Sequence, residues 1–185
     1  MDTSFDLVSR DGLPDALRVL LDDYPRDLWA SDPGFHGLVS FWLERHMGFR
    51  RLLAAMTEET EALLDKGDPQ RFMQRISRYG SIFVNDLHGH HQIEDHHYFP
   101  LLTERDSRLT RGFDILDKDH HALDGLLQDF VSAANEALTA QGATDPTARF
   151  HSNLTRLDRL ICRHLDDEED LIVPVILKYG TAGLD

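Results

Sequence analysis

Two short motifs in the chain combine a histidine with a glutamate at helical spacing. His90 is followed four residues later by Glu94, and His164 is followed four residues later by Glu168. In both motifs a proline stands six residues after the glutamate. Residues i and i+4 lie on one face of an α-helix, so each motif presents an imidazole and a carboxylate together. Both groups are ligands for divalent metal ions, and the repeated motif therefore predicts a metal site.

Two lone histidines extend this pattern. His46 precedes His90 by 44 residues, and His120 precedes His164 by the same number. In an antiparallel pair of helices, residues at equal distance from the connecting turn lie at the same height. The midpoint of each pair, and that of His90 and His120, falls in a segment whose glycine and proline are typical of a turn. We therefore expect the four histidines to lie in one layer of a helical core.

The inward-facing set predicted in this way has four imidazoles and two carboxylates. Its members are His46, His90, Glu94, His120, His164 and Glu168. Burying polar groups among apolar residues is costly unless each group is satisfied, and a pair of divalent ions would satisfy all six. Iron is the metal that we expect first, because imidazole and carboxylate ligands together suit it. Zinc or another divalent metal is the alternative.

Three further residues lie close enough in the sequence to bind a metal or to orient a ligand. His91 adjoins the first motif, His97 lies one turn beyond it, and Asp124 follows the second lone histidine by four residues. For each of them the alternative is an exposed side chain without a role at the site. The acidic run beside Glu168 is expected to be a solvated helix face. It comprises Asp166, Asp167, Glu169 and Asp170.

The rest of the sequence predicts the helices that must position these residues. Buried-type residues recur at alternating steps of three and four in four long segments, and no segment alternates as a β-strand does. Glycine and proline separate the segments, with the longest break over residues 100–112. Because short connections make neighbouring helices antiparallel, we predict an all-α fold, an up-down-up-down four-helix bundle over residues 35–179. A lead-in over residues 1–34 would hold a short helix at 14–23, and residues 180–185 would form a tail.

Composition narrows the possible classes of function. The 185 residues carry 19 Lys and Arg against 33 Asp and Glu, and this net charge of −14 disfavours binding to nucleic acid or an anionic membrane. No apolar run is long enough for a membrane span. The single cysteine, Cys162, excludes an internal disulfide and an all-thiolate metal site, and no secretory signal is visible. These features predict a cytoplasmic protein.

With these motifs the chain resembles the hemerythrin-like, HHE cation-binding family over roughly residues 36–178. The resemblance is carried by HHQIED with FP from His90, by HLDDEE from His164 with its proline, and by the lone histidines in LERHMGFRRLL and LDKDHHALDGLL. It implies a four-helix bundle that holds a non-heme, usually di-iron centre, with the six predicted residues as ligands and the two glutamates as bridges. Members of the family bind dioxygen reversibly, sense oxygen or iron, respond to nitric oxide or help repair iron–sulfur clusters.

The chain departs from the oxygen-carrying hemerythrins at two positions. Those proteins have a second histidine where this chain has Asp124, and their last carboxylate ligand follows its histidine by five residues. Here Glu168 follows by four and Glu169 by five. The resemblance is therefore closer to the bacterial and iron-sensing branches. A ferritin-like protein would instead show Glu-x-x-His on two helices, which this chain lacks.

The sequence thus predicts a metal-binding protein rather than an enzyme. We expect a non-heme di-iron centre that binds or senses dioxygen or a related small molecule such as nitric oxide or peroxide. The alternatives are an iron-dependent enzyme, a factor that repairs iron–sulfur clusters or donates iron, and an iron store. The metal, the number of ions, the physiological ligand, any protein partner and the oligomeric state are left open by the sequence.

Overall fold

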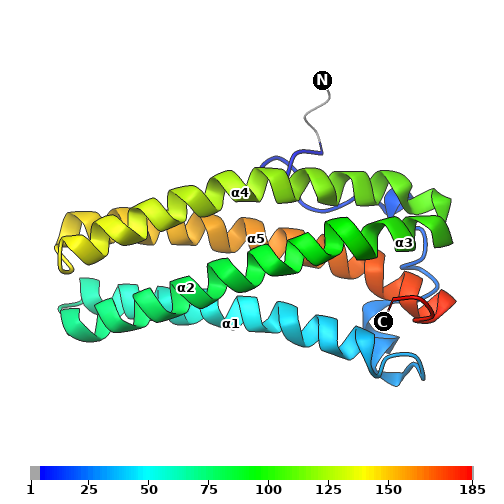
Figure 1. The fold of residues 1–185 in the computed structure, drawn as a ribbon, viewed down its shortest axis with the longest axis horizontal. Helices are drawn as coiled ribbons and strands as arrows, with labels where there is room; N and C mark the ends of the chain where they lie inside the picture. The colour runs from blue at the N-terminus through cyan, green and yellow to red at the C-terminus, as the bar shows by residue number, and fades with distance from the viewer. Residues whose placement is uncertain (1–4, 185) are drawn as a thin grey trace. The chain divides into compact units, whose positions relative to one another are not determined.

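The computed structural model describes residues 5–184, whose regular secondary structure is entirely helical (Figure 1). No β-strand occurs in this part of the chain, so the predicted all-α class is confirmed. Among these residues no helix is both long and apolar enough to cross a membrane. The five α-helices are α1 (Leu38–Leu64), α2 (Pro69–Ile93), α3 (Phe99–Arg105), α4 (Thr110–Thr139) and α5 (Thr144–Tyr179).

The chain divides into two compact units. Unit 1 comprises Met1–His46, His90–His121 and Cys162–Asp185, and unit 2 comprises Met47–Gly89 and Ala122–Ile161. Helices α1, α2, α4 and α5 each contribute a segment to both units. Since the six predicted metal ligands all belong to unit 1, that unit contains the candidate site.

Unit 2 has a core of interlocking aromatic rings. Phe83 of α2 packs edge-on against Phe49 of α1, with 6.2 Å between ring centroids, and against Phe130 of α4 at 6.0 Å. Phe150 of α5 contacts Phe130 at 5.6 Å and Phe72 of α2 at 6.3 Å. All four helical segments therefore contribute to one aromatic core.

Both connections in unit 2 are the tight turns that the sequence predicts. After α1, the Asp68 side chain accepts a hydrogen bond from the backbone N–H of Gln70 at 2.9 Å and so caps the start of α2. After α4, Gly142 has φ +78°, and a Cβ there would lie 2.9 Å from the Leu63 side chain. Only glycine fits this position without strain, because the backbone is left-handed and the neighbouring helix is close.

In unit 1, α2 passes into a π-helical turn, Glu94–Tyr98, and then into α3. The predicted break over residues 100–112 is therefore wrong in extent, because the chain stays helical as far as Arg105. Pro100 lies in the first turn of α3, directly after the π-helical turn. A π-helix has more residues per turn than an α-helix. Side chains after Glu94 are consequently rotated away from the register that a uniform α-helix predicts.

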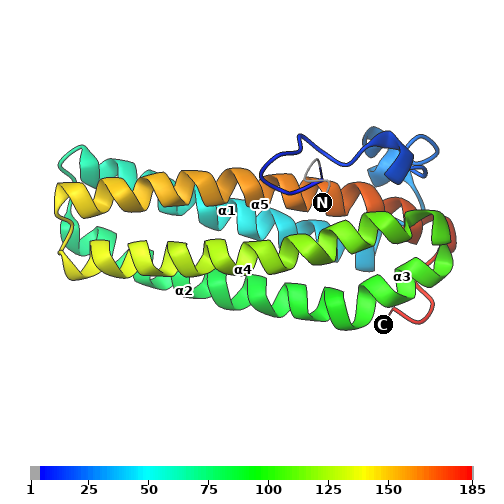
Figure 2. The same cartoon turned by 90° about the horizontal axis from the view of Figure 1, so that it is seen from above.

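The lead-in covers the outer face of the second half of α5 (Figure 2). In place of the predicted helix over 14–23 it has two 3-10 helices, η1 (Asp15–Leu17) and η2 (Arg26–Ser31). Leu20 and Trp29 of the lead-in are buried in the apolar core of unit 1. Leu17 and Leu21 pack against the same core and are partly buried, so the lead-in contacts the core without the predicted helix.

Candidate metal centre

Seven side chains of unit 1 bring their nitrogen and oxygen atoms together in two groups. Within each group, one atom from every member lies within 4.8 Å of those of the others. The first group is His46, His90, Glu94 and Glu168, and the second is His91, His120 and His164. The structure thus brings together all six residues predicted from the motifs, and it adds His91.

The first group has one residue each from α1, α2, the π-helix and α5. The Nε2 atoms of His46 and His90 lie 3.1 Å apart, and His90 Nε2 lies 3.1 Å from Glu94 Oε1. Glu168 Oε2 lies 3.6 Å from His46 Nε2. Donor atoms about 3 Å apart have the spacing of neighbouring ligands on one ion with bonds of roughly 2.1 Å.

In the second group, two histidine rings of α2 and α4 stack. The His91 and His120 centroids are 4.0 Å apart, with 10° between the ring planes. Glu168 Oε1 lies 3.2 Å from His120 Nε2 and 3.0 Å from His164 Nε2. Glu94 Oε2 also approaches His120 Nε2, at 3.7 Å. Both carboxylates therefore contact histidines of both groups, as bridging ligands would.

Several atoms of the cluster are buried without a hydrogen bond. In the described part of the chain, both oxygens of Glu94, Oε2 of Glu168, and Nε2 of His91 and His164 lack a partner in hydrogen-bond geometry. Glu94, Glu168 and His164 have no exposed surface. Unsatisfied buried polar atoms destabilise a fold, and these five atoms all belong to side chains of the two donor groups. A set of imidazoles and carboxylates arranged in this way fits divalent metal ions, which would satisfy these atoms.

The two glutamates have opposite electrostatic environments. Burial raises the pKa of Glu94 well above its ordinary value, and the negative charge of Glu168 raises it further. Burial acts in the same direction on Glu168, but the charges and hydrogen bonds of His164, His120 and His46 together outweigh it and hold the pKa of Glu168 well below its ordinary value. Burial alone would lower the pKa of His164, but Glu168 and a hydrogen bond to Asp119 raise it to about 9. The cluster thus carries protons that a metal would displace.

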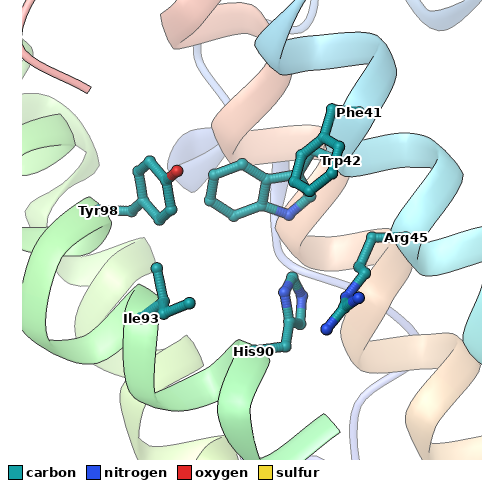
Figure 3. Close-up of a pocket in the computed structure, with 6 residues that line it drawn as sticks. All are labelled: Phe41, Trp42, Arg45, His90, Ile93 and Tyr98. Carbon is teal, nitrogen blue, oxygen red and sulfur yellow. The ribbon is translucent and has the colours of Figure 1, made fainter. Parts of the chain in front are cut away.

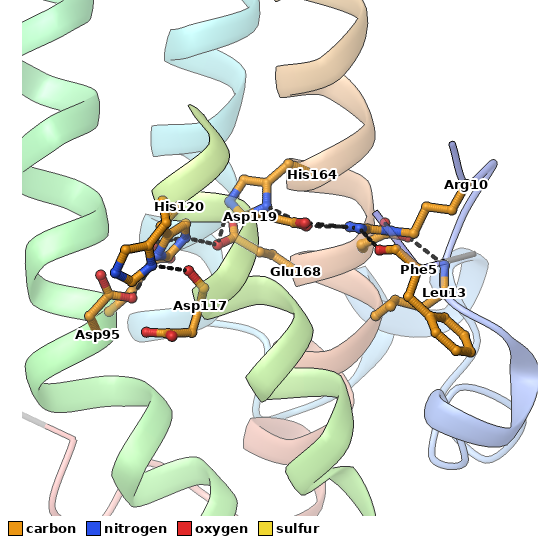
Figure 4. A network of polar contacts seen from close by, with 12 residues as sticks. Phe5, Arg10, Leu13, Asp95, Asp117, Asp119, His120, His164 and Glu168 are labelled. Carbon is orange, nitrogen blue, oxygen red and sulfur yellow. Dashed lines mark hydrogen bonds and ion pairs between the residues drawn. The ribbon is translucent and has the colours of Figure 1, made fainter. Parts of the chain in front are cut away.

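Three carboxylates behind the cluster orient its histidines. His120 Nδ1 donates to Asp95 at 2.6 Å, and His46 Nδ1 donates to Glu169 at 3.0 Å. A third contact joins His164 Nδ1 to Asp119 at 3.4 Å (Figure 4). A proton held on Nδ1 leaves the Nε2 lone pair facing the cluster, which is the arrangement of a metal-binding histidine.

Sequence reasoning missed these carboxylates, although a signal for them was present. Asp95, Asp119 and Glu169 each stand directly beside a predicted ligand in the chain. A carboxylate next to a ligand residue lies about 100° around the helix, where it can reach a histidine of the neighbouring helix from behind.

The expectation that the acidic run beside Glu168 is solvated is wrong. Asp167, Glu169 and Asp170 are 1%, 6% and 6% exposed. Arginines of the lead-in cover them, since Arg10 binds Asp167, and Arg26 binds both Glu169 and Asp170. Arg10 and Arg26 lie outside the four long segments whose apolar periodicity predicts the helices, so this periodicity could not reveal the cover.

Two of the additional candidates lie elsewhere. His97 is exposed, and its ring contacts Tyr98. The π-helix explains this position, because the extra residue in the turn rotates His97 away from the face that carries Glu94. Asp124 belongs to unit 2, where it lines a surface cavity with His88.

A small cavity opens beside the first group of donors. It measures about 160 Å³ and is lined by Phe41, Trp42, Arg45, His90, Ile93 and Tyr98 (Figure 3). The His90 side chain is 10% exposed, whereas the side chains of the other three residues of the first group are at most 1% exposed. Trp42 turns its indole nitrogen toward this region and donates to His46 Nε2 at 2.8 Å. The cavity therefore adjoins the cluster at His90.

The helices of unit 1 enclose five imidazoles and two carboxylates that could hold metal ions, which is the arrangement of a helical metal-binding protein. The family model of the hemerythrin HHE cation-binding domain matches residues 37–177. The chain therefore belongs to this family, as its motifs predict. Comparison with curated proteins and with solved structures gave no match.

Proposed function

We propose that the chain is a non-heme di-iron protein that binds or senses dioxygen or a related small molecule such as nitric oxide or peroxide. The observation that carries this proposal is the pair of donor groups that Glu168 connects through its contacts with His120 and His164, and whose buried nitrogen and oxygen atoms are left unsatisfied. Mixed imidazole and carboxylate ligands suit iron, and two adjacent groups suit two ions.

In this proposal the ligands divide according to the two groups. His46 and His90 would hold one ion, and the three histidines of the second group would hold the other. Glu94 and Glu168 would both bridge them, since each contacts histidines of both groups. Iron bound there would supply electrons and an open coordination position for a diatomic ligand. The protein supplies fixed imidazole tautomers, one buried anionic carboxylate and an apolar surround that limits water.

The same proposal includes the up-down-up-down four-helix bundle. Short turns join α1 to α2 and α4 to α5, which favours antiparallel neighbours. In unit 1, contacts between His46 and His90 and between His120 and His164 support the pairing of the same helices.

The cavity beside His90 supports a small-molecule ligand. Its lining is mainly aromatic and aliphatic, and one wall is a residue of the cluster itself. An uncharged diatomic molecule crosses such a lining easily, whereas a large polar substrate would not fit.

The test is the metal content per chain of protein made in iron-replete cells, together with the absorption spectrum of the reduced protein before and after admission of air. We expect about two irons per chain and an air-dependent band in the near-ultraviolet to visible range. His90→Ala should lose iron, whereas His88→Ala, an exposed histidine on the same helix, should keep it.

Absence of metal, or only unreactive zinc, would contradict the proposal. Catalytic consumption of peroxide or nitric oxide would identify an enzyme in place of a binding protein. Transfer of iron to a damaged iron–sulfur protein would instead identify a repair factor.

A further inference from the structure

The segment that precedes the matched family domain reaches the metal centre through Arg10. This side chain is 2% exposed, and both of its terminal nitrogens donate to the carboxylate of Asp119. Its Nε donates to Asp167 at 2.9 Å, and one terminal nitrogen also donates to the backbone carbonyl of Phe5 at 2.8 Å. Figure 4 shows Asp119 between Arg10 and His164. The guanidinium therefore fixes Asp119 on the side away from the cluster.

A second arginine of the same segment repeats this arrangement on another helix face. Arg26 donates to Glu169 Oε2 at 2.7 Å and to Asp170 at 2.6 Å. The other oxygen of Glu169 accepts the Nδ1 proton of His46 at 3.0 Å. One carboxylate thus joins a lead-in arginine to a cluster histidine, as Asp119 does on α4.

We propose that the lead-in is a working part of the metal centre, in which Arg10 and Arg26 are positioning residues that hold Asp119 and Glu169 so that these orient His164 and His46. This inference rests on the proposed metal-binding function. A planar guanidinium holds a carboxylate at two points and restricts its rotation. A carboxylate fixed in this way keeps the imidazole ring at one angle, and loss of such outer contacts typically weakens metal binding by 10–100-fold.

Arg18 provides a matched control within the same segment. It donates to Asp170 at 2.7 Å and to Asp15 at 2.7 Å. In the described part of the chain Asp170 accepts hydrogen bonds from arginines and from no cluster histidine. Removing Arg18 therefore weakens docking of the lead-in onto α5 without disturbing a histidine contact.

The experiment compares Arg10→Gln, Arg26→Gln and Arg18→Gln in the full chain. Cobalt(II) is titrated into each protein after removal of metal, and the visible spectrum and the affinity are recorded together with the melting temperature. We expect Arg10→Gln and Arg26→Gln to weaken cobalt binding by about tenfold or more and to shift the visible bands. Arg18→Gln should lower the melting temperature but leave the affinity within about twofold and the spectrum unchanged.

Two features keep this test decisive. Arg26 is 41% exposed at its side chain, so Arg26→Gln is expected to fold even if loss of the buried Arg10 prevents folding. Arg10→Lys keeps the positive charge but not the two-point contact with Asp119. Compared with Arg10→Gln, it should recover more of the melting temperature than of the wild-type cobalt spectrum.

Wild-type affinity and spectrum in Arg26→Gln and Arg10→Gln would overturn the inference. An equal loss of cobalt affinity in Arg18→Gln would also overturn the inference, because the lead-in would then act only by covering α5. A wild-type protein that takes up neither cobalt nor iron would overturn the proposed function as well.

Discussion

Glu94 and Glu168 occupy equivalent positions in the two sequence motifs but differ in charge. Burial and a neighbouring carboxylate favour the protonated form of Glu94, whereas His164 keeps Glu168 ionised. The sequence predicts both residues as ligands because i, i+4 spacing is local. It does not predict their difference, which depends on side chains that approach from other helices.

His164 makes the stability of protein stripped of metal depend on pH. Burial opposes its charge, but Glu168 and Asp119 raise its pKa from 6.5 to about 9 in the folded chain. Because the folded pKa is the higher one, its contribution is complete below about pH 6.5 and is lost as the pH rises through about 9. The shift corresponds to at most roughly 3 kcal/mol.

Thermal unfolding between about pH 6 and 10 tests this prediction, with metal-loaded protein as the control. Bound metal keeps the metal-binding nitrogen of His164 unprotonated, so the melting temperature of the loaded protein should not fall as the pH rises through this range. A melting temperature of the stripped protein that stays constant across this range would contradict the assignment.

At the scale of elements, the π-helical turn decides which histidines belong to the cluster. Uniform α-helical register places His97 on the inner face with Glu94, and the structure instead exposes it. His91 lies before the turn, on α2, and is 4% exposed with its Nε2 unsatisfied. A π-turn has no simple sequence signature, so periodicity predicted the helix but not the rotation within it.

A pair of variants tests this division of roles. His91→Ala should weaken binding of one ion by about tenfold or more, because the second group would keep only two imidazoles. His97→Ala should bind metal as the wild type does. Stepwise titration with iron measures the affinity of both variants. An equal loss of iron affinity in the two variants would contradict the assignment of His91, and not His97, as a ligand.

The cavity between α1 and α2 leads to a second prediction, which concerns the route by which a small ligand enters. Ile93 lies at its edge and is 54% exposed, so a larger side chain there should obstruct the opening without disturbing the core. Ile93→Trp should slow the spectral response of iron-loaded protein to azide by roughly tenfold, as measured by stopped flow. Ile82→Trp, on the same helix within unit 2, is the control. Equal rates in all three proteins would place the entry route elsewhere.

At the scale of the whole molecule, the two units differ in what they bury. Unit 2 buries packed phenylalanines, whereas unit 1 buries the histidine and glutamate cluster and the lead-in ion pairs beside an apolar core of its own. The turns of unit 2 were predictable because glycine and proline mark them. The covering of α5 by Arg10 and Arg26 was not predictable, because these contacts join residues more than 140 positions apart.

Hydrogen exchange should reveal this difference. Metal binding should slow amide exchange in the helical segments of unit 1 by about tenfold or more, since only the folded site binds the ion. Exchange in the aromatic core of unit 2 should change little. Equal slowing in both units would show that they unfold together.

The hydrogen bond from Trp42 to His46 has an optical consequence. The indole N–H donates to the Nε2 atom that a metal would occupy, so loading must break this bond and change the surroundings of the ring. The chain's other tryptophan, Trp29, donates to the carbonyl of Tyr24 and is not part of the cluster. Tryptophan emission should therefore respond to loading chiefly through Trp42, and a Trp42→Phe variant should lose most of that response. The protein would then carry its own fluorescent indicator of whether the centre is filled.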